Sequence, residues 1–210
     1  MQKKLSGLII LAITSPAIAN SNFYAGVSLG KTDNKFTSTI SSVIFEESFN
    51  DSSQFSDDST SYSIRGGYYF HKNFAVEIGH YEYGEVTASF GDSMKADIET
   101  SSNNIGAKAV WPITDSLSLS ARLGIAKWDF DYTSTDSSVP GESVNFNESD
   151  TDAYYGVGVE YNINDRVNIG LEYSSLSMKW GTSDSNEDFS LNTDTEHEVN
   201  SLSLTAQMNF

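Results

Sequence analysis

The chain has 210 residues, about the size of one domain, and a formal net charge of −17 from 12 basic and 29 acidic residues. Such an acidic balance excludes ordinary nucleic-acid binding, because contacts to phosphate need a basic surface. The chain contains no cysteine, so a disulfide framework is also excluded.

The first nineteen residues have the features of a cleaved secretory signal peptide. Lys3 and Lys4 form a short positive region, and the apolar stretch at residues 5–13 is too short to span a membrane. The Ala-Ile-Ala sequence at residues 17–19 has the small-residue pattern that precedes a cleavage site. We therefore predict a signal peptide over residues 1–19, and its removal takes the net charge from −17 to −17 − 2 = −19.

The mature chain, residues 20–210, alternates apolar and polar residues with a period of two. This period is typical of β-strands with two different faces. No stretch approaches roughly 18 consecutive apolar residues, so we expect no transmembrane helix. Eight strands are predicted, at residues 23–30, 62–70, 74–79, 104–111, 117–126, 153–163, 167–174 and 201–210.

Short and long connections alternate strictly between these strands. The short ones are typical of tight hairpin turns, and the long ones are expected to be irregular loops. Bacterial membrane barrels arrange short periplasmic turns and longer extracellular loops in this way, whereas a soluble domain rarely carries four such loops. We therefore predict an all-β, eight-stranded antiparallel transmembrane up-and-down β-barrel. The turns lie at residues 71–73, 112–116 and 164–166, and the loops at about 32–61, 84–101, 129–152 and 181–199.

The polar face of the strands indicates which side faces lipid. It is rich in small residues and carries three positive and three negative charges, which would pair inside a narrow barrel. The apolar face would then contact lipid, with closure satisfying the backbone. A soluble, lipocalin-like barrel would invert these faces and is the alternative. The predicted interior charge network consists of Arg65, Glu77, Lys108, Arg122, Glu160 and Glu172.

Aromatic residues cluster near the predicted strand ends, as the girdles of a membrane barrel would. Three of them near the long connections, Tyr81, Trp128 and Trp180, have the parity of the inward face. Either a β-bulge near Ser174 or strands that project beyond the membrane would explain this parity. The sequence leaves both explanations open.

Three segments resemble the OmpA-like "porin family" of outer-membrane β-barrel domains: FYAGVSLGK, IRGGYYFHKNFAVEIGHYEYG and LSARLGIAKWDFD. The resemblance implies an eight-stranded barrel with both termini periplasmic and paired interior charges. The terminal SLSLTAQMNF, with Met208 and Phe210, resembles the signal read by the barrel assembly machinery. The chain stops at Phe210, so a peptidoglycan-binding domain and cell-wall tethering are not implied.

No catalytic set is evident, and we expect no enzyme and no cofactor. His71 lies in a predicted turn and His197 in an acidic loop, which leaves His80 as the one histidine with tolerable placement for catalysis near the outer rim. A base also needs an oriented nucleophile within reach, and abundant loop serines do not identify one. Residues 147–152 offer hard oxygen ligands for calcium but match no complete calcium loop, so we assign no metal site.

The leading hypothesis is a non-enzymatic surface protein in the outer membrane of a Gram-negative bacterium. A rigid barrel would present acidic extracellular loops for adhesion, colonisation or other surface interactions. The alternatives are a narrow porin-like channel gated by the interior charges and, more weakly, a lipid A-modifying enzyme. The expected partners are outer-membrane lipid and lipopolysaccharide, the assembly machinery and a host or cell-surface ligand, with no nucleic acid.

Overall fold

The computed structural model consists of eight β-strands in its described part. The described residues are 22–44, 47–90, 94–136, 143–185 and 189–210. The predicted signal peptide at residues 1–19 lies outside them. Within them, no helix is long and apolar enough to cross a membrane. The strands are β1 (Phe23–Ile44), β2 (Glu47–His71), β3 (Phe74–Phe90), β4 (Met94–Pro112), β5 (Leu117–Asp136), β6 (Ser143–Asn162), β7 (Val167–Ser185) and β8 (Phe189–Asn209).

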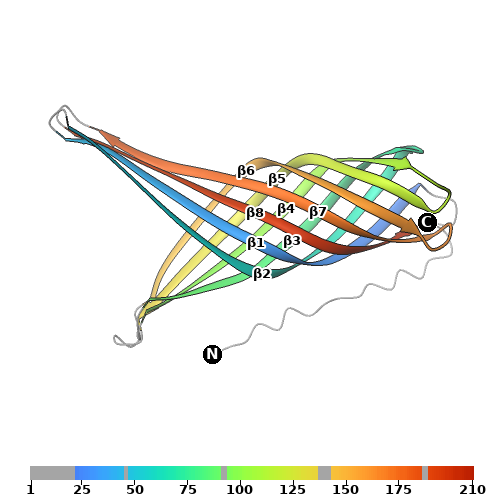
Figure 1. Cartoon of the computed structure of the whole chain (residues 1–210), viewed down its shortest axis with the longest axis horizontal. Coiled ribbons are helices and arrows are strands. Elements are labelled where there is room, and N and C mark those ends of the chain that lie inside the picture. The colour runs from blue at the N-terminus through green and yellow to red at the C-terminus, as the bar shows by residue number, and fades with distance from the viewer. Residues whose placement is uncertain (1–21, 45–46, 91–93, 137–142, 186–188) are drawn as a thin grey trace.

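The strands form one closed antiparallel barrel in which each strand pairs with its sequence neighbours and β8 pairs with β1 (Figure 1). Val27 of β1, for example, lies between Ile64 of β2 and Ala206 of β8. Closure gives the backbone polar groups partners within the wall, as a structure that spans lipid requires. The prediction of an all-β, eight-stranded up-and-down barrel is confirmed.

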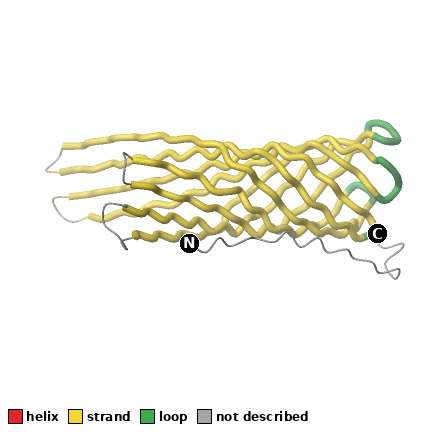
Figure 2. Tube along the Cα trace, turned by 90° about the horizontal axis from the view of Figure 1, so that it is seen from below, coloured by secondary structure: helices red, strands yellow, loops and turns green. Residues whose placement is uncertain are grey.

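Three short turns lie at one end of the tube, here named the turn end (Figure 2). In the β6–β7 turn, the Asn164 Oδ1 accepts hydrogen bonds from the backbone N–H groups of Arg166 and Val167, both at 2.9 Å. Such side-chain bonding to the local backbone favours asparagine in turns. The backbone N–H of Phe210 donates to the carbonyl oxygen of Phe23 at 2.9 Å. The barrel wall therefore begins and ends at the turn end.

The strands continue far beyond the length that a membrane requires. They have 17 to 25 residues, whereas a tilted transmembrane strand needs about 9–11. The expectation of irregular loops was wrong, because it rested on the end of the clear alternation of apolar and polar residues, and these segments are instead rich in Ser, Thr and Asp. Paired strands outside a membrane carry these side chains toward water. The segments 32–61, 84–101, 129–152 and 181–199 are strand over most of their length and form what we name the extended end.

Outward-facing apolar side chains form a band around the part of the barrel next to the turns, here named the apolar belt. Leu123 and Leu204 are typical members, with 66% and 70% of their residue surface exposed. The band gives way to charged residues toward the extended end, as at Lys31 on β1 and Lys127 on β5. A continuous apolar band of this kind is the lipid-facing surface of outer-membrane barrels.

Beyond the belt, the two faces of the wall exchange character. Trp128 and Met178 are completely buried inside the barrel there, while their sequence neighbours Asp129 and Lys179 are on the outward parity. Apart from a register shift between Glu82 and Glu85 of β3, the strands keep their alternation. The apolar residues now lie inside and the polar residues outside. This is the arrangement of a soluble β-structure.

The inward parity of Tyr81, Trp128 and Trp180 now has one explanation. The pairing of β7 with β8 runs through Ser174 and Ser201 without a register shift. The alternative of a β-bulge near Ser174 was therefore wrong. The strands project beyond the belt, and these aromatic side chains pack in the interior of the projecting part.

Two seams divide the extended end into two four-stranded lobes, which diverge in Figure 1. The pairing of β2 with β3 ends at Tyr62 and Glu82, and that of β6 with β7 ends at Tyr154 and Leu176. The other strand pairs continue toward the tips. The first lobe comprises residues 35–44, 47–61, 177–185 and 189–198, and the second lobe comprises residues 83–90, 94–101, 129–136 and 143–153.

Gly84 lies where the β2–β3 seam opens, and we predict that its replacement is costly. Its φ is +83°, and an added Cβ would lie 2.5 Å from the carbonyl oxygen of Thr60. Gly84→Ala should therefore lower the free energy of unfolding by about 1–3 kcal/mol. Urea unfolding of the detergent-folded barrel, followed by tryptophan fluorescence, measures this.

Gly66→Ala is the matched control, because a Cβ there meets nothing nearer than the Tyr24 carbonyl oxygen at 3.9 Å. Its unfolding midpoint should stay near that of the wild type. A Gly84→Ala midpoint equal to the Gly66→Ala midpoint would contradict the strained role of Gly84.

Candidate functional site

Six charged side chains point into the barrel at the level of the belt and form what we name the charge network. Each of the strands β2 to β7 contributes one residue on its inward face. All six are buried, so neither lipid nor bulk water can compensate their charges, and they must pair with one another. The members are Arg65, Glu77, Lys108, Arg122, Glu160 and Glu172.

Arg122 contacts all three carboxylates of the charge network. Its Nε lies 3.1 Å from Oε1 of Glu77, and its Nη2 lies 3.7 Å from Oε1 of Glu160. Its Nη1 donates to Oε2 of Glu172. The planar guanidinium presents five donors in a fixed fork, which suits contacts in several directions. Arg122 is therefore the centre of the network.

The other two cations complete the pairing. Arg65 Nη1 lies 2.7 Å from Oε1 of Glu172, and Lys108 Nζ lies 2.8 Å from Oε1 of Glu160. Three positive charges thus face three negative charges, and each has an opposite partner. The six residues singled out from the sequence are all brought together.

Tyr24 and Gln207 also belong to this layer, although the sequence analysis did not single them out. The Tyr24 hydroxyl donates to Oε2 of Glu77 at 2.7 Å, and Lys108 Nζ donates to Oε1 of Gln207 at 2.7 Å. Both lie on the inward parity of β1 and β8, which the alternation could have shown. Their partners depend on the register of the closed barrel, which the alternation does not contain.

A small polar cavity lies next to the charge network on the side of the extended end. Its volume of about 10 Å³ has room for roughly one water molecule. Serines line most of it, so a water there would find hydrogen-bond partners. The lining residues are Ser28, Ser61, Tyr62, Tyr81, Tyr83, Glu172, Ser174, Ser201 and Ser203.

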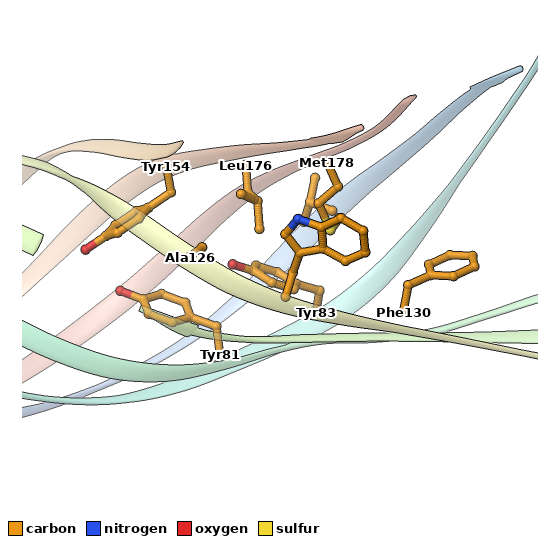
Figure 3. Packing of buried hydrophobic residues seen from close by; sticks show 9 residues of the cluster. Tyr81, Tyr83, Ala126, Phe130, Tyr154, Leu176 and Met178 are labelled. Carbon is orange, nitrogen blue, oxygen red and sulfur yellow. The ribbon is translucent and has the colours of Figure 1, made fainter. Parts of the chain in front are cut away.

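Packed aromatic and aliphatic side chains fill the interior beyond this cavity; we name them the plug (Figure 3). The Trp128 and Trp180 rings lie 5.6 Å apart, and Phe130 lies 5.1 Å from Trp180. The Trp128 Nε1 donates to Oδ2 of Asp152 at 2.8 Å, so its polar atom is satisfied. The plug comprises Tyr81, Tyr83, Ala126, Trp128, Phe130, Tyr154, Leu176, Met178 and Val199, with Phe36, Ile98, Tyr132 and Trp180 packed against it.

His197 lies in the same layer, which corrects its expected place in an acidic loop. Its side chain is completely buried, and its ring stacks on Phe36 with 3.9 Å between centroids. Its Nε2 lies 3.1 Å from Oδ1 of Asn34, and its Nδ1 has no hydrogen-bond partner among the described residues. Burial lowers the pKa of His197 to about 3. Its alternation with Glu196 and Glu198, which have the outward parity, was the signal that could have revealed it.

His80 lies on the outward face at the edge of the apolar belt. Its Nε2 lies 3.0 Å from Oε1 of Glu82, and its Nδ1 lies 3.0 Å from Oδ1 of Asn103. Both ring nitrogens thus have partners other than a serine. In the part of the chain that the structure describes, neither ring nitrogen is hydrogen-bonded to a hydroxyl that it could activate.

The calcium-type ligands at residues 147–152 lie on β6 rather than in a loop. Alternation along the strand sends Glu148 and Asp150 to one face and Asn147 and Ser149 to the other. Across the described ranges, no group of three or more acidic or histidine side chains is placed to hold a metal ion.

The residues of the expected assembly signal lie at the turn end of β8. Met208 is on the outward face with 46% of its surface exposed, and Phe210 is held by the backbone bond to Phe23. An accessible position is what reading by another protein requires. Their role in assembly stays a prediction.

Comparison with known proteins identifies the relatives of this chain. The family model described as "Outer membrane protein beta-barrel domain" matches residues 6–210. Outer membrane protein A of Shigella flexneri is 32% identical over 110 residues, which make up 51% of this chain and 30% of that protein. The chain thus matches less than a third of that relative's length.

Two solved structures share the fold. The outer membrane protein OprG of Pseudomonas aeruginosa has a TM-score of 0.55 at 14% identity, and Neisserial surface protein A has a TM-score of 0.53 at 12% identity. Each match covers 90% of this chain and 98% of the other. At such identities the likeness concerns the fold alone.

We predict that Arg122→Leu lowers the free energy of unfolding by about 3–5 kcal/mol, because it leaves three buried carboxylates with two cations. Urea unfolding in detergent measures the loss. Arg166→Leu, the same change at an exposed turn position, should have little effect. Equal midpoints for the two variants would show that the charge network contributes no stability.

A further prediction concerns the effect of pH on His197. A histidine whose folded pKa is near 3 and whose unfolded pKa is about 6.5 stabilises the fold above pH 6.5, and this stability falls as the pH drops toward 3. Between pH 7 and pH 5 the wild type should therefore lose about 2 kcal/mol more than His197→Gln. Urea unfolding at the two pH values measures this difference. If the unfolding free energies of the wild type and His197→Gln change equally with pH, the buried neutral imidazole is contradicted.

Proposed function

The chain belongs to the outer-membrane β-barrel domain family of Gram-negative bacteria, and we propose that it is a closed, non-enzymatic surface scaffold. In this proposal its extended end projects from the cell and carries its interactions. The apolar belt would hold the barrel among lipid and lipopolysaccharide. The barrel assembly machinery would insert it, reading the strand that ends at Phe210.

The main support for the proposal is that side chains fill the lumen at two levels. The charge network closes it at the level of the belt, and the plug closes it again beyond the belt. A transport route would need space along the axis, whereas the strands instead continue outward as paired wall. The strands thus form a surface that projects beyond the belt, and such a rigid scaffold would display binding residues.

The orientation follows from the turns. Bacterial barrels place short turns in the periplasm and longer segments outside the cell. The three tight turns and both ends of the wall share one end. We therefore assign the turn end, with both termini, to the periplasm and the extended end to the exterior.

Shortening the first lobe tests the proposal. Lys35 pairs with Ser56 across the β1–β2 hairpin, so replacing residues 36–55 by Asn-Gly keeps the register of the remaining wall. We predict that cells with this variant lose adhesion to epithelial monolayers and autoaggregation, relative to cells with equal amounts of the full-length protein. Retention of every surface phenotype would contradict the proposal, provided that the shortened barrel still migrates as a compact species on unboiled gels.

A gated channel is the second candidate, because one carboxylate could exchange its cation partner and let water pass the polar cavity. Planar-bilayer recordings separate the two candidates. A closed scaffold predicts no stable conductance for the wild type. Stable steps that change in Glu77→Ala would favour the channel, since Glu77 contacts Arg122 at the centre of the network.

A further inference from the structure

The two lobes face each other across a fork that opens above the plug. At the base of the fork, Phe36 of the first lobe and Phe130 of the second lie 6.2 Å apart. Beyond this contact the lobes diverge (Figure 1). The register of each lobe identifies the side chains on its inner face, because paired residues share a face.

Apolar side chains on the inner faces remain exposed above the base. Phe49 and Ile40 of the first lobe have 56% and 45% of their surface exposed. Val144 and Phe146 of the second lobe have 67% and 45% exposed. These side chains lie beyond the belt, so lipid does not cover them. Exposed apolar surface in water on facing walls is typical of a binding site.

The charges of the extended end are divided between its two faces. All described lysines there have the outward parity, and most pair with outward carboxylates. The pairs are Lys31–Asp58, Lys35–Glu198, Lys95–Asp97 and Lys179–Glu196. The outer face therefore carries charges of both signs, although its carboxylates outnumber its lysines.

The inner faces of the described part carry carboxylates but no basic side chain. In the described ranges, no lysine or arginine lies on either inner face of the fork. None of the four outer-face ion pairs includes Asp51, Asp57, Glu148, Asp150 or Asp184. The fork is consequently anionic inside. Five of the exposed or half-exposed inner-face carboxylates are Asp51, Asp57, Glu148, Asp150 and Asp184.

These carboxylates lie on the strands that border the seams. Asp51 and Asp57 are on β2, Glu148 and Asp150 on β6, and Asp184 on β7. The inner faces of the central strands are mainly apolar or uncharged. The seam strands also carry the exposed Phe49, Val144 and Phe146, so a ligand would meet apolar side chains and carboxylates together along the seams.

The seam strands also offer free backbone groups. Beyond Ser59, whose hydroxyl donates to the carbonyl oxygen of Tyr83, the described part of β2 pairs with β1 alone. β6 likewise pairs with β5 alone over residues 143–153. An extended peptide can add to such an edge through main-chain hydrogen bonds.

We infer that the fork binds an extended, cationic and amphipathic polypeptide segment that presents apolar side chains together with Lys or Arg. A second copy of this chain is a poor occupant, since it is itself strongly acidic. A purely apolar ligand would not use the carboxylates, and an anionic one would be repelled. The inference rests on the proposed function and names the chemistry of the partner.

Fluorescence anisotropy of a labelled decapeptide of alternating lysine and valine tests this, with the purified full chain in nanodiscs of zwitterionic lipid. We expect saturable binding that weakens with salt and exceeds binding to empty nanodiscs. Peptides with glutamate in place of lysine, or serine in place of valine, should not bind. Equal binding of either one overturns the inference.

A variant with four inner carboxylates neutralised, D51N/D57N/E148Q/D150N, should bind about 10- to 100-fold more weakly. The matched control, D33N/E99Q/D129N/D194N, removes the same charge from the outer face and should bind like the wild type. If both variants lose the same amount of peptide affinity, the effect is due to net charge alone and the inference is overturned. If the first variant does not fold, D51N/D57N and E148Q/D150N are measured separately.

This experiment is independent of cellular orientation, because nanodiscs expose both ends of the barrel. If the full chain binds the peptide but cells with the shortened first lobe keep every surface phenotype, the proposed function alone is contradicted. If cells with the shortened first lobe lose their surface phenotypes but the full chain does not bind the peptide, the inference alone is contradicted. The two failures are therefore distinguishable.

Discussion

The contacts of Arg122 with three carboxylates fix the side of the wall that faces lipid. A buried charge left without a partner costs several kcal/mol, so these side chains must lie where other strands can supply opposite charges. Only the interior of a closed wall brings six strands within reach of one another. Because side chains alternate, a slip of one residue would turn the charges outward. The register, the closure and the outward apolar belt thus depend on the same network.

The same alternation of inward and outward side chains runs through a part of the wall that faces lipid and a part that faces water. On β5, Leu123 faces outward in the belt, whereas Trp128, five residues later, faces the interior of the extended end. The parity is unchanged, and the composition of the two faces is exchanged. The extended end therefore has an apolar core of its own, built on top of a membrane barrel. Where its two seams open, part of that core becomes a surface that a partner can reach.

The alternation was sufficient to predict the strands of the belt and the six charges, because lipid on one side and a narrow lumen on the other impose a strict pattern. It failed beyond the belt, where Ser, Thr and Asp are compatible both with loops and with water-facing strands. His197 was misplaced for that reason, since its acidic neighbours have the outward parity. The seams could not be predicted, because they depend on register and on the left-handed backbone at Gly84, neither of which the alternation contains.

The exchange of faces along a single strand can be measured directly, because the chain has no cysteine of its own. Spin labels on single cysteines at Leu123 and Asp129, two outward positions on β5, would be compared in lipid bilayers. The account predicts that the label at Leu123 is reached by oxygen dissolved in lipid, and the label at Asp129 by a water-soluble nickel complex. Lipid exposure at Asp129, or water exposure at Leu123, would contradict it.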